Sequence, residues 1–151
     1  MSKPDFLQEA WTHPEPAEIF RNDQVLIIPD IKPAVTGQLL VVYSKPSWNV
    51  MDPLDVACLY NVAERVCAEL EVAYQPTRGT GLTRFGNDSP TPHIICYPRN
   101  SVEDGVLLHD KDRPKATSEK LAETQHIMQA QFERSGFASK IQTILGSLSL
   151  G

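Results

Sequence analysis

The sequence lacks the features that mark several large classes of protein. Its three cysteines, Cys58, Cys67 and Cys96, form neither a Cys-x-x-Cys pair nor an even set, which argues against a disulfide framework and favours free, mostly buried thiols. No apolar run approaches the ~18 residues of a membrane span, and the first residues contain no basic stretch followed by an apolar one. We therefore expect no membrane association and a cytoplasmic location.

A basic excess is also missing. Lys and Arg number 14 against 19 for Asp and Glu, a net charge of −5, so the electrostatic footprint of a nucleic-acid-binding protein is absent. His109 with Asp110 and Asp112 is typical of a solvated charged loop, because no second ligand cluster with metal-site spacing accompanies it. The sequence predicts no metal and no cofactor. Small anionic ligands remain compatible with it, because they need only local donors.

What the sequence does have is the composition of a single globular domain. Hydrophobic residues make up 41% and charged residues 22%, and 12 prolines divide the chain into short elements. A length of 151 residues suits one core, so we expect one domain over residues 1–151.

Two helices are predicted from hydrophobic periodicity. Over 52–74, apolar residues recur every three or four positions after an N-cap at Asp52 and a proline at the first helical position. A second helix is expected over 117–135, with Gly136 as its stop, and the tail 137–151 is expected either to dock or to fray.

Four strands complete an α+β fold. Runs bounded by turn residues and rich in Val, Ile and aromatic residues predict strands at 23–30, 37–44, 80–87 and 91–97. We expect the helices to cover one face of the sheet, which leaves the other face for solvent, a partner chain or a ligand.

A lone histidine, His93, lies in the last predicted strand. Alternate side chains of a strand share a face, so Thr91, His93, Ile95 and Tyr97 are expected to point one way, while Cys96 points the other. From the residues alone, His93 is either part of a site or an ordinary strand residue.

The residues around His93 resemble the closing motif of the histidine triad (HIT) superfamily of nucleotide-binding and nucleotide-hydrolysing proteins. Many members close their last strand with Pro-His-x-His-x-His-x-x-Pro-Arg. The run "PTPHIICYPR" (90–99) keeps the first proline, the middle histidine as His93 and the closing Pro-Arg. Thr91 and Ile95 stand where the other two histidines are usual, so the triad is degenerate. An alternative register that starts at Pro92 needs a two-residue deletion and also lacks two histidines.

The upstream sequence extends the resemblance. The stretch "NDQVLIIPDIKPAVTGQLLVVYSK" (22–45) is similar to the family's first strand pair, with Asp30 in place and Gln38 where a histidine is usual. The resemblance covers residues 20–99. It implies a HIT-like antiparallel sheet with the long amphipathic helix packed on it. Residues 100–151 are expected to form a C-terminal helical extension that is absent from a minimal family core.

The same resemblance implies a chemistry. In the family, the middle histidine attacks the α-phosphorus of a nucleotide, and its position is that of His93. An imidazole suits this role because a pKa near 6.5 leaves it largely neutral and nucleophilic at cellular pH. Neither Thr91 nor Ile95 can act as a general acid. We therefore expect a weak nucleotidyl hydrolase or transferase acting on a nucleoside phosphate ester or phosphoramidate.

The nucleotide contacts follow from the same comparison of residues. The resemblance assigns Asp30 to the ribose hydroxyls, although a turn-forming role for this aspartate stays open. Hydrophobic residues of the first strand and turn are assigned to a base pocket, and polar residues near His93 to the phosphate. The base-pocket residues are Leu26, Ile28 and Ile31, and the phosphate residues are Asn87, Ser89, Thr91 and Arg84.

The partners implied are a purine nucleotide, or a related phosphorylated nucleoside, and a second copy of the chain, because many family members pair through the long helix and adjoining strand. Two alternatives stay open. The missing histidines and the extension are compatible with a catalytically inactive HIT-like domain that serves as a protein-binding or regulatory module. A different phosphate ester, served by Thr91 and Arg84, is the other alternative.

Overall fold

The computed structural model describes residues 6–12, 17–84, 89–104 and 113–150. Their elements, in chain order, are α1 (Phe6–Thr12), β1 (Phe20–Arg21), β2 (Val25–Pro29), β3 (Leu39–Tyr43), the short helix η1 (Trp48–Val50), α2 (Pro53–Tyr74), β4 (Thr80–Thr83), β5 (His93–Pro98), α3 (Ser118–Ser135) and α4 (Phe137–Leu150). The α+β fold predicted from the sequence is confirmed.

The strands form one antiparallel sheet in the order β1-β2-β3-β5-β4. Strands β2, β3 and β5 lie within the predicted ranges or extend them by one residue. Strand β4 ends at Thr83, and residues 85–87 of the predicted strand lie outside the described residues. The two-residue strand β1 was not predicted, because a pair of residues carries no periodic signal.

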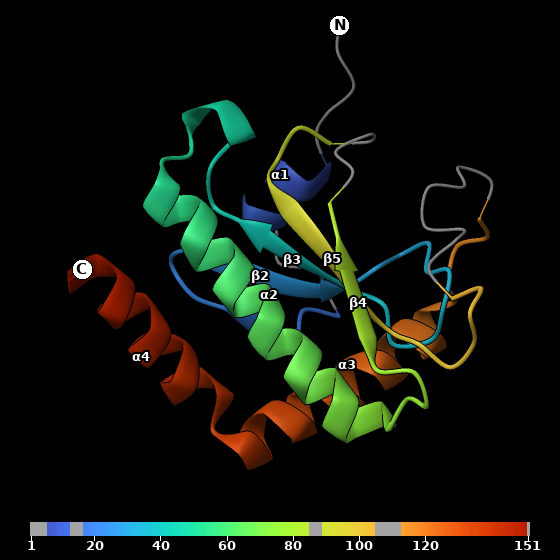
Figure 1. The fold of residues 1–151 in the computed structure, drawn as a ribbon. Coiled ribbons are helices and arrows are strands. Elements are labelled where there is room, and N and C mark those ends of the chain that lie inside the picture. The colour runs from blue at the N-terminus through green and yellow to red at the C-terminus, as the bar shows by residue number, and fades with distance from the viewer. Residues whose placement is uncertain (1–5, 13–16, 85–88, 105–112, 151) are drawn as a thin grey trace, which may run out of the picture.

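The helix α2 begins as the sequence predicts. The Asp52 carboxylate accepts a hydrogen bond from the Asp55 backbone N–H at 2.8 Å, and the Asp55 carboxylate accepts one from the Asp52 N–H at 3.0 Å, which completes a capping box. Its inward stripe, which includes Leu59, Val66 and Leu70, is fully buried against the sheet. Figure 1 shows α2 crossing the face of the sheet nearest the viewer.

The C-terminal extension packs on this same core. Helix α3 begins after its N-cap Thr117 and ends at Ser135, followed by the C-cap Gly136 with φ +68°, as the sequence predicts. The tail forms α4, so it docks: Phe137 and Ile141 are fully buried. Phe137 stacks on Phe132 with ring centroids 3.8 Å apart, and both belong to the cluster that α2 makes with the sheet.

The opposite face of the sheet is covered as well, which corrects one prediction. Leu7 and Ala10 of α1 are buried on the side of the sheet facing away from α2. We call this apolar group the α1-side cluster; its sheet residues are Leu26, Ile28, Leu40, Val42 and Ile95. Figure 1 shows α1 behind the sheet and α2 in front of it. Helices therefore lie on both faces, and the second face is not left wholly open.

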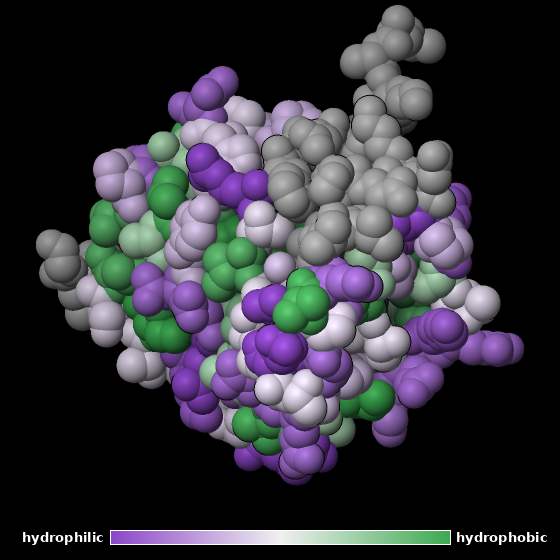
Figure 2. Space-filling model, turned by 45° about the vertical axis from the view of Figure 1, so that its right-hand side comes forward, coloured by the Kyte–Doolittle hydropathy of each residue, from purple (hydrophilic) through white to green (hydrophobic). Residues whose placement is uncertain are grey.

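No helix among the described residues has the length and apolar character needed to cross a bilayer. On the face drawn in Figure 2, hydrophobic side chains are interspersed with polar ones. The three cysteines are free and buried, as predicted.

Candidate functional site

His93 is the first residue of β5, on the face of the sheet that carries α1. Strand pairing places it opposite Val42 of β3, and its side chain is only 8% exposed. The ring nitrogen Nδ1 lies 2.7 Å from the carbonyl oxygen of Thr91. A carbonyl oxygen can only accept, so Nδ1 carries a hydrogen, and in the neutral ring the lone pair is on Nε2. The backbone two residues upstream thereby fixes the orientation and tautomer of His93.

The first degenerate position, Thr91, is a fully buried polar residue. Its hydroxyl donates a hydrogen bond to Oε1 of Gln8 at 3.3 Å, and its backbone N–H donates one to Oγ of Ser89 at 3.2 Å. Ser89 itself is buried. The structure thus brings Ser89 and Thr91 together immediately before His93.

Gln8 is a site residue that sequence reasoning missed, because helix α1 was not predicted. A signal for α1 exists in "FLQEAW", where Phe6 and Leu7 are followed at helical spacing by Ala10 and Trp11. Seven residues are too few for periodicity alone to separate a helix from an apolar turn. Tertiary packing against the sheet selects the helix.

The second degenerate position, Ile95, is part of the α1-side cluster. It is 6% exposed and lies opposite Leu40 on β3. Leu26 and Ile28, assigned above to the base pocket, are buried in the same cluster, whereas Ile31 is exposed and belongs to neither core cluster. The structure brings Leu26 and Ile28 together under α1 and leaves Ile31 apart from them.

Asp30 and Gln38 face each other at the far end of the same sheet face. The Gln38 amide donates to Oδ2 of Asp30 at 2.8 Å, and the Lys32 backbone N–H donates to Oδ1 at 2.9 Å. Oε1 of Gln38 accepts from the Ala34 N–H at 2.9 Å, which fixes the amide orientation. Asp30 therefore forms the turn. Each carboxylate oxygen can accept a further hydrogen bond, so a second, ligand-binding role remains open to it.

One further predicted site residue, Arg84, is not near His93 in the described structure. The Arg84 guanidinium lies 4.0 Å from the centre of the Trp48 ring, and Trp48 packs on the α2 side of the sheet. Arg84 is therefore on the opposite face from Thr91, and the structure does not unite these two residues as an alternative phosphate site. Asn87 lies outside the described residues, as do His109, Asp110 and Asp112.

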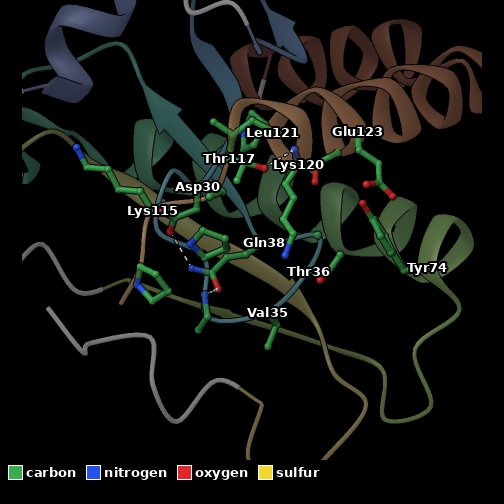
Figure 3. Close-up of a pocket in the computed structure, with 17 residues that line it drawn as sticks. Asp30, Val35, Thr36, Gln38, Tyr74, Lys115, Thr117, Lys120, Leu121 and Glu123 are labelled. Carbon is green, nitrogen blue, oxygen red and sulfur yellow. Dashed lines mark hydrogen bonds between the residues drawn. The ribbon is translucent and has the colours of Figure 1, made fainter. Parts of the chain in front are cut away.

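A pocket of about 540 Å³ opens beside Asp30. The turn between β2 and β3 forms one wall, the end of α2 at Tyr74 a second, and residues 114–124 a third. Burial raises the pKa of the Tyr74 hydroxyl, so this group stays protonated. Figure 3 shows the Lys120 side chain running from α3 into the pocket toward Thr36, while the Lys115 amine points away.

Metal binding has no candidate site in the described part of the chain. No three His, Cys, Asp or Glu side chains among these residues lie close enough together to hold an ion. The groups present at the site are an oriented imidazole, hydroxyls and a turn carboxylate. Such groups can attack phosphorus and bind sugar hydroxyls.

Comparison with known proteins gives a clear answer for the fold. No family model matches the sequence, and no curated protein matches it closely. Among solved structures, a HIT-like protein involved in cell-cycle regulation from Bartonella henselae has a TM-score of 0.68 and 16% identity, over 87% of this chain and 98% of that one.

Two more solved structures have a similar fold. A histidine triad nucleotide-binding protein from Sulfolobus tokodaii has a TM-score of 0.67 and 19% identity, over 85% and 91% of the two chains. The diadenosine triphosphate hydrolase of Plasmodium falciparum has a TM-score of 0.63 and 13% identity, over 80% and 79%. This chain therefore has the HIT-like fold. Because 87% of it is matched by the Bartonella protein, the likeness extends beyond residues 20–99.

Proposed function

We propose that this chain is a nucleotide-binding protein in which His93 contacts the phosphate, and that it retains slow nucleotidyl transfer to water or another acceptor. The ligand class is a purine nucleotide or a related phosphorylated nucleoside. The orientation of His93 carries the proposal: Nδ1 is held 2.7 Å from the Thr91 carbonyl, which leaves Nε2 with the lone pair of a nucleophile.

The reaction proceeds in two steps. Nε2 of His93 bonds to the α-phosphorus while the bond from phosphorus to the leaving group breaks, and water then releases the nucleotide from the ring. A neighbouring histidine would supply a proton to the leaving group, a contribution of about 10²–10⁴-fold. Thr91 and Ile95 cannot supply it. Substrates whose leaving group departs without a proton, such as a nitrophenyl ester, are therefore favoured over alkyl esters.

Nucleoside binding is proposed at the other end of the same face. Asp30 and His93 both point to the α1 side by strand alternation. Asp30 would accept the ribose hydroxyls through the unused lone pairs of its carboxylate. Leu26 and Ile28 are buried under α1, so of the three residues assigned to the base pocket Ile31 is the one that offers exposed apolar surface to a base.

The test is a comparison of His93→Ala with His126→Ala, a substitution of an exposed histidine on α3. AMP and GMP are expected to raise the melting temperature of wild type and of His126→Ala, because a ligand that binds only the folded state stabilises it by RT ln(1 + [L]/Kd). The shift should be smaller in His93→Ala. Turnover of a nucleotidyl nitrophenyl ester, and a nucleotidyl adduct on His93 detected by mass spectrometry, should be lost in that variant.

Turnover that persists unchanged in His93→Ala would overturn the catalytic assignment. A saturable shift without any turnover would leave His93 as a binding residue only. No shift with AMP or GMP at several millimolar would remove the nucleotide-binding proposal altogether.

A second candidate function is a catalytically inactive module that binds a protein or regulates one. The packing of Ile95, Leu26 and Ile28 under α1 favours it, because these positions serve the core of the molecule. Both oxygens of Asp30 also have partners within the chain. Absence of affinity for every mononucleotide tested, beside a stoichiometric complex with a defined protein, would support this function over the first.

We also propose a homodimer, as the resemblance implies. Leu54 and Val72 are exposed and lie 18 residues apart on α2, which is five helical turns, so they share one face of the helix. Light scattering at micromolar concentration measures the assembly directly. A monomer at that concentration would contradict the dimer.

A further inference from the structure

The pocket beside Asp30 is partly built by residues outside the family-like core. Its volume of about 540 Å³ lies within the range of small-molecule sites. Residues 114–124, from the C-terminal extension, form one wall. This wall is held in place because the Ala116 N–H donates to the Ile31 carbonyl at 2.8 Å and the Arg113 guanidinium donates to the Lys32 carbonyl at 2.6 Å.

Two opposite charges enter this pocket without neutralising each other. Asp30 is buried at its floor, and Lys120 runs into it from α3 (Figure 3). Neither takes part in a salt bridge among the described residues. A ligand that offers one hydroxyl group to Asp30 and a negative group to Lys120 would satisfy both.

Position along the sheet separates this pocket from His93. The Asp30 N–H donates to the Gln38 carbonyl, while His93 lies opposite Val42, four residues further along β3. At ~3.3 Å per residue this is about 13 Å along the strands, and β3 also lies between the two residues. A nucleotide that places its 5′-phosphate at His93 and its ribose at Asp30 therefore has no 5′-phosphate oxygen near Lys120.

The base of a nucleotide offers no negative group to Lys120 either, because adenine and guanine are uncharged at neutral pH. A negative group on the ribose itself does fit. Glu123, which lies beside Tyr74 on the other side of the pocket (Figure 3), adds negative charge there and confines an anion to the Lys120 side. Thr36, toward which Lys120 points, offers a hydroxyl to the same anion.

We propose that the substrates are nucleotides with a second phosphate on the 2′ or 3′ oxygen of the ribose, held by Lys120 of the C-terminal extension. This rests on the proposed function, because it takes the ribose at Asp30 and the 5′-phosphate at His93 as given. The extension would then select among nucleotides, while residues 20–99 provide the reacting group.

The experiment measures the dissociation constants of 5′-AMP, adenosine 2′,5′-bisphosphate and adenosine 3′,5′-bisphosphate by calorimetry at one fixed salt concentration. One bisphosphate is expected to bind about tenfold more tightly than 5′-AMP, because a charge-assisted hydrogen bond contributes at this scale. Lys120→Gln should bring the bisphosphate to within about twofold of 5′-AMP, and Lys120→Arg should keep most of the preference. Lys140→Gln, which removes a lysine of α4 outside this pocket, is the matched control and should keep it in full.

The outcomes separate this proposal from the one on which it rests. Equal affinity of wild type for all three nucleotides, with His93-dependent binding of 5′-AMP, overturns the role of Lys120 alone. The role of Lys120 is also overturned if Lys120→Gln keeps the preference for the bisphosphate over 5′-AMP. It is likewise overturned if Lys140→Gln removes that preference. A Lys120-dependent preference in a protein whose dissociation constants for all three nucleotides are unchanged by His93→Ala supports the Lys120 site and overturns the assignment of His93. No binding of any of the three overturns both.

Discussion

Phe137→Ala tests whether the C-terminal extension is an integral part of the folded unit. Phe137 is fully buried, its ring stacks on Phe132 at 3.8 Å between centroids, and it meets the ring of Phe20 edge-on at 5.1 Å. Truncation of a buried phenylalanine to alanine costs about 3–5 kcal/mol. The whole free energy of unfolding of a domain is about 5–15 kcal/mol, so this single change should remove a large share of it.

The assay is urea unfolding followed by tryptophan fluorescence and by circular dichroism. Trp11 and Trp48 lie before residue 100, so their fluorescence reports on the sheet and α2, while circular dichroism is weighted toward the helices. Both signals should shift to lower urea together. Val102→Ala is the control, since Val102 is 64% exposed and its truncation should change the free energy of unfolding by less than about 0.5 kcal/mol. A tryptophan transition unmoved by Phe137→Ala would refute one cooperative unit over residues 1–151.

Two further predictions concern stability. Burial raises the pKa of Asp55, but hydrogen bonds from Lys45 and Tyr43 outweigh it and hold this pKa below the ordinary 3.8. The contribution of Asp55 to the free energy of unfolding is therefore present above pH 3.8 and is lost as pH falls further. Asp55→Asn should flatten the acid side of a plot of urea midpoint against pH. An unchanged slope would contradict this. Gly37→Ala should lower the free energy of unfolding by more than about 1 kcal/mol, because φ is +88° and a Cβ would lie 3.0 Å from the Tyr74 ring. Thermal unfolding measures this change. An unaltered melting temperature would exclude backbone strain at this position.

Much of the fold is predictable because it rests on local signals. Helix α2 has an N-cap, a proline at its first position and a long apolar stripe, and the structure confirms its bounds to the residue at the C-terminal end. Helix α3 likewise has its N-cap at Thr117 and its stop at Gly136. In these segments, cap chemistry and periodicity agree, so little is left to tertiary structure.

The site is less predictable because it depends on contacts between distant parts of the chain. Alternation along β5 correctly separates His93 from Cys96, which belongs to the core under α2. The facing of Arg84 was not fixed by sequence, since it follows a four-residue strand at the sheet edge, and the structure places it on Trp48. The hydrogen bond between Gln8 and Thr91 joins residues 83 positions apart in the sequence, so no local pattern can predict it.

Both ends of the candidate site are shaped by residues outside 20–99, the segment whose sequence resembles the family. At the His93 end, α1 supplies Gln8 to Thr91 and covers Ile95, while at the Asp30 end residues 114–124 supply the wall that carries Lys120. The two positions of the missing histidines are therefore filled by residues that pack with α1. Restoring histidines there would place bulky polar rings in a buried apolar and hydrogen-bonded setting. Thr91 and Ile95 are thus part of how this chain packs.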